Sequence, residues 1–171
     1  MDAEKTTEDA VDRIVAQWAV ARPDLDVSPM TVVGRIHRAA AALDVRLRAT
    51  FAEYGLADGE FDVLATLRRS GPGAPYRLTP GELSDSMMVT SGAVTKRVDR
   101  LERAGLVSRE VSAADGRGRV ITLTEAGRAL GDEALAAHVA NEDALLDPLS
   151  GAERVRLADL LRKLLVGLEG W

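Results

Sequence analysis

The stretch Thr90-Ser-Gly-Ala-Val-Thr-Lys-Arg-Val-Asp-Arg-Leu-Glu-Arg-Ala-Gly105 decides how the rest of this sequence is interpreted. Its apolar residues Val94, Val98 and Leu101 recur at i, i+4 and i+7. This spacing predicts a helix from about residue 91 to residue 104 with one buried stripe. Gly105 follows the last turn and is expected to end the helix, because glycine readily takes the backbone conformation found there.

The face opposite that stripe is polar and mostly basic. At about 100° per residue it carries Gly92, Lys96, Asp99, Arg100 and Arg103. Small and hydroxyl residues near the N-terminal end permit close approach to base edges, and the cations farther along can meet phosphates. This pattern is typical of a helix that reads the major groove of DNA. A solvated helix face has a similar pattern, so the flanking segments decide between the two.

Those segments predict a helix-turn-helix followed by a hairpin. Thr79-Pro-Gly-Glu82 is a capping box that opens a short helix ending near residue 87. Residues 106–111 and 119–123 read as two strands around the turn-rich tip Asp115-Gly-Arg-Gly118. A short capped helix before the basic helix and a basic-tipped hairpin after it favour a DNA-binding winged helix-turn-helix.

The remaining segments predict helices. One runs from near Thr7 to before Pro23, a second from Pro29 to before Gly55, and a third opens at Asp58. Thr124 is expected to cap a sixth helix, and the capping box Ser150-Gly-Ala-Glu153 a seventh. The last helix is expected to bury its apolar residues, which are Val155, Leu157, Leu160, Leu161, Leu164 and Leu165. The fold class is therefore mainly α with a small β-hairpin wing.

Composition excludes several classes of protein. The net charge of the 171 residues is −5, yet seven basic residues stand against four acids between Thr90 and Thr124, which fits a dedicated contact face. The absence of cysteine excludes disulfides and thiol chemistry, and the two histidines, His37 and His138, lack the spacing of metal ligands. No cofactor or metal is expected. No pattern of a phosphate loop or a catalytic serine occurs, so an enzyme is not expected.

No apolar run approaches the roughly 18 residues that a membrane helix needs, and the acidic N-terminus lacks the features of a signal peptide. We therefore expect a cytoplasmic protein without a membrane partner.

Several segments resemble the MarR family of transcriptional regulators. They are residues 89–109, residues 115–127, Glu60-Phe-Asp-Val-Leu64 and Leu149-Ser-Gly-Ala-Glu153. The resemblance covers roughly residues 28 to 168. It implies a homodimer that binds double-stranded DNA at a pseudo-palindromic operator and, as in most relatives, represses until a small molecule binds. The implied regions are dimerisation helices in 1–55, the winged helix-turn-helix in 56–124 and further dimerisation helices in 125–171.

The resemblance also assigns roles to residues. Ser91, Thr95 and Lys96 are expected to face the major groove, Arg117 to enter the minor groove and Asp115 to brace the wing. Together with the outer face of the basic helix, the expected DNA-contact set is Thr90, Ser91, Gly92, Thr95, Lys96, Arg100, Arg117 and Arg119. The sequence departs from the family at Gly116, where many relatives carry an arginine, and at Ala57, where Asp58 is expected to replace a threonine cap.

Arg97 predicts a second kind of site. It lies about 70° from the centre of the apolar stripe, and a buried arginine needs an anionic partner. The arrangement resembles a urate-responsive subgroup of the family, whose matching positions here are Trp18, Asp62, Arg97 and Arg109. These four would bind a small organic anion. Alternatively Trp18 is plain core, Asp62 an exposed helix residue and Arg109 a support for the wing.

A winged helix that docks a protein instead of DNA is the alternative function. Such a module would show exposed apolar residues on the outer face of the basic helix, where this sequence carries cations.

Overall fold

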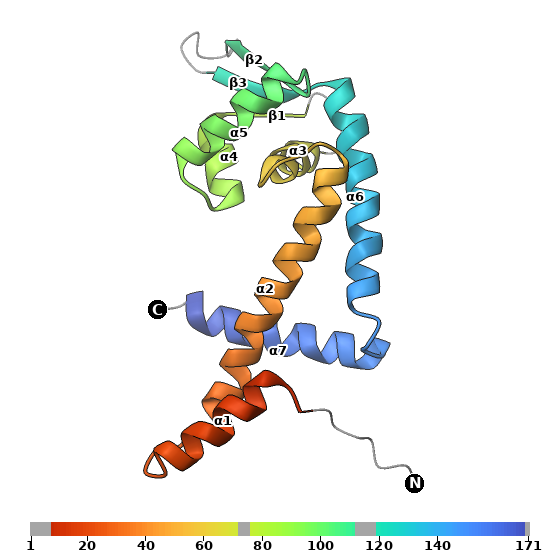
Figure 1. Ribbon diagram of the computed structural model, residues 1–171. Helices are drawn as coiled ribbons and strands as arrows, with labels where there is room; N and C mark the ends of the chain where they lie inside the picture. Colours follow the sequence, from red (N-terminus) through yellow and green to blue (C-terminus); the bar gives the residue numbers. More distant parts are fainter. Residues whose placement is uncertain (1–7, 72–75, 112–118, 170–171) are drawn as a thin grey trace. The chain divides into compact units, whose positions relative to one another are not determined.

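The computed structural model describes residues 8–71, 76–111 and 119–169, and it divides into two compact units, Met1–Arg46 and Leu47–Trp171. The elements are α1 (Ala10–Ala21), α2 (Pro29–Glu53), α3 (Glu60–Arg68), β1 (Arg77–Leu78), α4 (Pro80–Met87), α5 (Ser91–Arg103), β2 (Val107–Val111), β3 (Arg119–Leu123), α6 (Glu125–Leu145) and α7 (Gly151–Glu169) (Figure 1). None of the described helices is long and apolar enough to cross a membrane. The units do not coincide with the three regions predicted from the sequence. The assignment of those regions to dimerisation and DNA binding stays a prediction.

The first unit packs α1 against the N-terminal part of α2. Asp9 caps α1 by accepting hydrogen bonds from the Val11 and Asp12 backbone N–H groups. Val11 is buried, and a Cβ on Gly34 would come within 3.1 Å of its side chain, so a glycine on α2 allows this close approach. Arg35 ties the two helices further by ion pairs to Asp9 and Asp12.

The apolar side chains of α1 are only partly buried. Val11 is buried, whereas Ile14 and Trp18 are 41% and 47% exposed. Thr7, near which the helix was predicted to start, lies outside the described residues, and the helix itself begins at Ala10.

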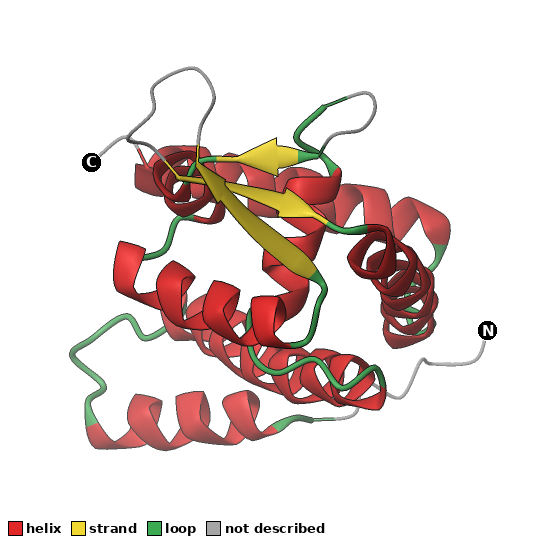
Figure 2. Cartoon of the chain, turned by 90° about the horizontal axis from the view of Figure 1, so that it is seen from above, coloured by secondary structure: helices red, strands yellow, loops and turns green. Residues whose placement is uncertain are grey.

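The second unit contains the predicted winged helix. The strand order of its antiparallel sheet is β1-β3-β2, and the hairpin register pairs Val107 with Leu123 and Val111 with Arg119 (Figure 2). The described part of the wing is therefore the base of the hairpin, since residues 112–118 lie outside it. The prediction of a mainly helical fold with a small β-hairpin wing is confirmed.

The core of this unit explains why α5 takes its orientation. Val94, Val98 and Leu101, the stripe predicted from their spacing, are each no more than 1% exposed. The buried apolar residues that they join are Leu56, Phe61, Val63, Leu64, Leu67, Leu83, Val107, Ile121, Leu123 and Ala134. Burying one face of α5 leaves the opposite face in solvent, so the core determines which residues α5 presents outward.

The turn between α4 and α5 is built from local hydrogen bonds. The Thr79–Glu82 capping box opens α4 as predicted. Met88 then takes a left-handed conformation with φ 53°, which is uncommon for a residue with a side chain. Two hydrogen bonds between Ser84 and Val89 hold the turn: Val89 N donates to Ser84 O, and Ser84 Oγ donates to Val89 O. α5 therefore starts at a defined angle to α4.

A second junction connects α5, β2 and α6. The Thr124 hydroxyl donates to Gly105 O at 2.8 Å and accepts from Gly127 N at 3.0 Å, while Thr124 N donates to Leu106 O at 3.2 Å. A Cβ on Gly127 would lie 1.9 Å from Leu106 O, so only glycine fits there. We call these four residues the Thr124 joint. It fixes the start of α6 to the end of α5.

The predicted start of α3 is wrong. Asp58 does not cap the helix but forms an ion pair with Arg48. The capping position is Gly59, whose φ of 71° favours glycine. The Glu60 carboxylate reaches back and accepts a hydrogen bond from Ala57 N at 2.7 Å, so a side chain inside the helix closes this turn.

The predicted burial of the α7 leucines is also wrong for the single chain. The Ser150–Glu153 capping box forms as predicted, but no described residue of α7 is buried. Leu160, for example, is 57% exposed. Periodicity shows that one face of a helix will be covered, but it does not show whether the same chain covers it.

Candidate nucleic-acid interface and anion site

The outer face of α5 is open and polar. Ser91, Gly92, Thr95 and Lys96 are all exposed. A Cβ on Gly92 would meet nothing within 4 Å, so packing within the chain does not require glycine at this position. Because glycine in a helix costs up to about 1 kcal/mol relative to alanine, an approaching partner better explains its presence.

The hydroxyl groups at the start of α5 have distinct roles. The Thr90 side chain accepts from Ala93 N and caps the helix. Thr95 Oγ1 donates to Ser91 O at 3.0 Å and keeps its lone pairs free on the exposed face. Thr90 is therefore primarily a cap, and Ser91 and Thr95 are better placed to meet a ligand in front of the helix.

The cations of α5 differ in how far they are committed to other groups. Lys96 has no carboxylate partner within the described residues. Arg100, in contrast, holds Glu60 through an Nε to Oε1 contact of 2.9 Å, with its side chain 49% exposed. Arg103 Nε donates to Asp99 O. Lys96 is thus the freest cation of the expected DNA-contact set on this helix.

Glu60 is a positioning residue that the sequence analysis missed. It is 4% exposed and uses one carboxylate oxygen for Arg100 and the other for Ala57 N. It therefore links α5 to the first turn of α3. The available signal was a carboxylate three residues after Ala57, which is the spacing of a capping interaction.

The wing is tied to α5 by Arg109. From β2, this side chain pairs with Asp99 and with Glu102, the latter at 2.9 Å, and also reaches Thr95 O. Arg119 is exposed at the base of the hairpin on β3. Arg117 and Asp115, expected at the wing tip, lie outside the described residues.

Arg97 faces inward as predicted. Its Nη1 atom is buried and has no hydrogen-bond partner among the described residues. The guanidinium occupies the space above Gly59, where a Cβ would come within 2.0 Å of Arg97 Cζ. The backbone conformation at position 59 favours glycine, and the missing side chain also leaves room for the Arg97 guanidinium.

Within the second unit, the structure does not bring Arg109 and Arg97 together. Arg109 contacts Thr95 and Asp99, which lie about 160° around α5 from Arg97, so the two arginines are on opposite sides of the helix. Asp62 is exposed on α3. Trp18 belongs to the first unit. The expectation that Arg109 lines a pocket with Arg97 is corrected: helix periodicity places them apart, and two acids already satisfy Arg109.

An aromatic cluster beside α3 carries further unpaired polar atoms. Phe51 and Phe61 stack with ring centroids 4.3 Å apart, and His138 lies 5.0 Å from Phe51. His138 Nδ1 and Asn141 Nδ2 are buried without a hydrogen-bond partner among the described residues. The place of His138 in this cluster depends on contacts between distant segments, so the sequence indicated only that His138 lacks the spacing of a metal ligand.

Known proteins resemble this chain over most of its length. Residues 54–118 match the MarR family. The HTH-type transcriptional regulator PecS of Dickeya dadantii (strain 3937) is 42% identical over 88% of this chain and 90% of its own. The structure of an E. coli MarR variant complexed with operator DNA has a TM-score of 0.69 at 28% identity, over 82% of this chain and 99% of that one.

A structure of BpsR from Bordetella bronchiseptica has a TM-score of 0.67 to this chain. The DNA binding of BpsR is regulated by 6-hydroxynicotinic acid. BpsR is 26% identical over 78% of this chain and 91% of that chain.

Proposed function

The chain belongs to the MarR family of DNA-binding transcriptional regulators, and we propose that it represses transcription as a homodimer on a pseudo-palindromic operator until a small organic anion releases it. Because a transcriptional regulator acts on genomic DNA, we propose that the protein works in the cytoplasm. The relatives are transcriptional regulators rather than enzymes, and a winged helix used only for protein docking is not favoured.

One observation carries the DNA-reading part of the proposal. The buried stripe of α5 turns Ser91, Thr95 and Lys96 outward on one exposed face. Hydroxyl groups can donate to or accept from base edges, and an unpaired lysine can meet a phosphate. Arg119, with Arg117 from the wing tip, would extend the same basic surface toward the minor groove.

The exposed apolar face of α7 supports the homodimer. Leu157, Leu160, Leu161, Leu164 and Leu165 are all at least 37% exposed in the single chain. A second copy of the same helix would cover them, because a two-fold axis brings the same patch of both chains together. Such symmetry would present two α5 helices to successive major grooves, as a pseudo-palindrome requires.

The unpaired guanidinium of Arg97 supports the anionic effector. A buried guanidinium nitrogen without a hydrogen-bond partner is costly, and a carboxylate or enolate from a ligand would satisfy it. Arg97 lies on the same helix as Lys96, so an anion there would bear directly on the helix that reads DNA. Asp62 and Trp18 stay candidates for the same site, whereas Arg109 is a support for the wing.

The DNA-binding proposal is tested by fluorescence anisotropy with DNA from the region upstream of the protein's own gene. Wild-type affinity should fall by orders of magnitude from about 50 mM to about 200 mM salt. Lys96→Ala should weaken binding uniformly across sequences and reduce the salt slope by about one. Lys163→Ala, an exposed lysine on α7, is the matched control and should leave the slope unchanged. No specific binding to any genomic fragment would contradict the proposal.

The effector proposal is tested by calorimetric titration of urate, citrate and aromatic carboxylates into wild type and Arg97→Ala. Binding should be lost or strongly weakened in the variant. Equal binding by both proteins would remove Arg97 from the site. An Arg97→Ala protein that still dissociates from DNA normally when the effector is added would rule out that effector binding at Arg97 causes DNA release through α5.

A further inference from the structure

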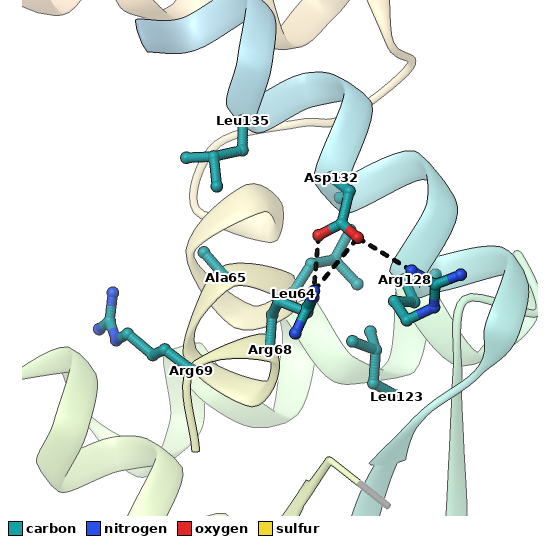
Figure 3. A pocket seen from close by; sticks show the side chains of 10 residues that line it. Leu64, Ala65, Arg68, Arg69, Leu123, Arg128, Asp132 and Leu135 are labelled. Atoms are coloured by element: carbon teal, nitrogen blue, oxygen red, sulfur yellow. Dashed lines mark hydrogen bonds and ion pairs between the residues drawn. The ribbon is translucent and has the colours of Figure 1, made fainter. Parts of the chain in front are cut away.

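A cavity lies between α3 and α6, away from the Arg97 side of the second unit. It has a volume of about 360 Å³ and opens at the surface (Figure 3). Its walls come from the C-terminal half of α3, the N-terminal half of α6 and the end of β3, and the residues are Leu64, Ala65, Arg68, Arg69, Leu123, Gly127, Arg128, Gly131, Asp132 and Leu135. The Arg97 guanidinium, in contrast, lies over Gly59 at the other end of α3.

A glycine on α6 keeps this cavity open. A Cβ on Gly131 would lie 3.5 Å from Leu64 Cβ, which is an ordinary van der Waals contact, so alanine would fit between α3 and α6. Glycine inside a helix costs about 1 kcal/mol relative to alanine. Packing of the two helices therefore does not account for Gly131. Gly131 lines the cavity, so a larger side chain at this position would reduce the space available to an occupant.

The lining combines an apolar wall with cations. Leu64, Ala65, Leu123 and Leu135 form the apolar part. Arg68, Arg69 and Arg128 outnumber the one acid in the lining, Asp132. An apolar pocket with a few oriented polar groups is the usual form of a small-molecule site, and the cations of this lining suit a ligand with a negative charge.

The arginines are not equally available. Asp132 receives Arg68 Nε at 2.9 Å and Arg128 Nη1 at 3.1 Å, and these three side chains point toward one another in Figure 3. Arg69 extends away from them. Its Nη2 donates to the Thr66 hydroxyl, and it has no carboxylate partner within the described residues. Arg69 is thus the cation that can pair with an incoming anion.

We propose that this cavity binds a small apolar carboxylate, with its hydrocarbon part against Leu64, Leu123 and Leu135 and its carboxylate at Arg69. The site is separate from the one proposed at Arg97. It does not depend on DNA binding.

The test is calorimetric titration of the full chain with octanoate, octan-1-ol and acetate at concentrations up to about 5 mM. Octanoate should bind, whereas octanol lacks the charge and acetate lacks the apolar body, so each should bind at least about tenfold more weakly. No octanoate binding in this range would overturn the proposal.

Three variants locate the site. Gly131→Leu fills the cavity and should weaken octanoate binding at least about tenfold, while helix propensity predicts a folded and no less helical protein by circular dichroism. Arg69→Gln should weaken binding by about tenfold, against no change for Arg13→Gln, an exposed arginine on α1. Arg97→Met distinguishes this cavity from the anion site proposed at Arg97. Loss of binding in Arg97→Met together with unchanged binding in Gly131→Leu would assign octanoate to the Arg97 side and overturn the proposal.

If Gly131→Leu lowers stability, Gly131→Ala replaces it. Alanine makes only an ordinary contact with Leu64, so it should fold normally and reduce octanoate affinity by a smaller factor. Affinity for octanoate that does not change in either variant contradicts the proposal.

Discussion

Replacing Arg97 by methionine should raise the stability of the protein when no effector is present. Methionine keeps much of the aliphatic volume above Gly59 but removes a guanidinium whose Nη1 is buried without a partner. An unsatisfied buried donor costs about 1–3 kcal/mol. Because Arg97 is only half-buried, we expect a gain near the low end, about 1 kcal/mol in the free energy of unfolding, or about 2–4 °C in Tm for a chain of this length.

The assay is urea unfolding followed by circular dichroism, at one fixed protomer concentration because a dimer makes stability concentration-dependent. The buffer should contain chloride as its only added anion. An effector that binds at Arg97 should then stabilise wild type but not the variant, so the order of stabilities reverses. A variant less stable than wild type by more than about 1 kcal/mol without effector would show that the Arg97 guanidinium has a stabilising partner in the folded protein.

Three further outcomes are expected. Glu60→Gln should lower the free energy of unfolding by about 1.5–3 kcal/mol in urea titrations, because a buried carboxylate with two partners becomes an amide that can accept from only one; a change below about 0.5 kcal/mol would refute its linking role. Gly127→Ala should destabilise by about 1–3 kcal/mol or more, since its Cβ would overlap Leu106 O, and a Tm equal to wild type would contradict this. The hydrogen bond from the Thr79 backbone N–H holds the pKa of Glu82 below its usual 4.5, so this stabilisation is present above that pH and is lost as pH falls through the lowered pKa. Glu82→Gln should therefore lose less stability than wild type between about pH 6 and about pH 3. Parallel curves of unfolding free energy against pH for the two proteins would argue against this.

Local chemistry made much of the fold predictable. The capping box at Thr79, the proline that opens α2 at Pro29 and the period of the α5 stripe each act within a few residues, and each prediction is confirmed. The inward position of Arg97 also followed from its angle to that stripe. In these cases the determining contacts lie within one helical turn or along one helix face.

Contacts between distant segments escaped prediction. The start of α3 depends on Gly59, and the space above Gly59 is occupied by the guanidinium of Arg97 from another helix. Glu60 and Arg100 meet only because the core packs α3 against α5. The separation of Arg109 from Arg97 follows from which side of α5 the wing covers. No single stretch of sequence contains this information.

The Thr124 joint makes α6 a lever for the DNA-reading helix. Its 21 residues span about 31 Å, so a tilt of about 5° around its C-terminal end would carry the joint, and α5 with it, through about 3 Å. In the proposed dimer two such displacements would add, on a duplex whose half-sites repeat at about 34 Å. A ligand that changes the angle of α6 only slightly could therefore move the two α5 helices out of register with the helical repeat of DNA while both stay folded.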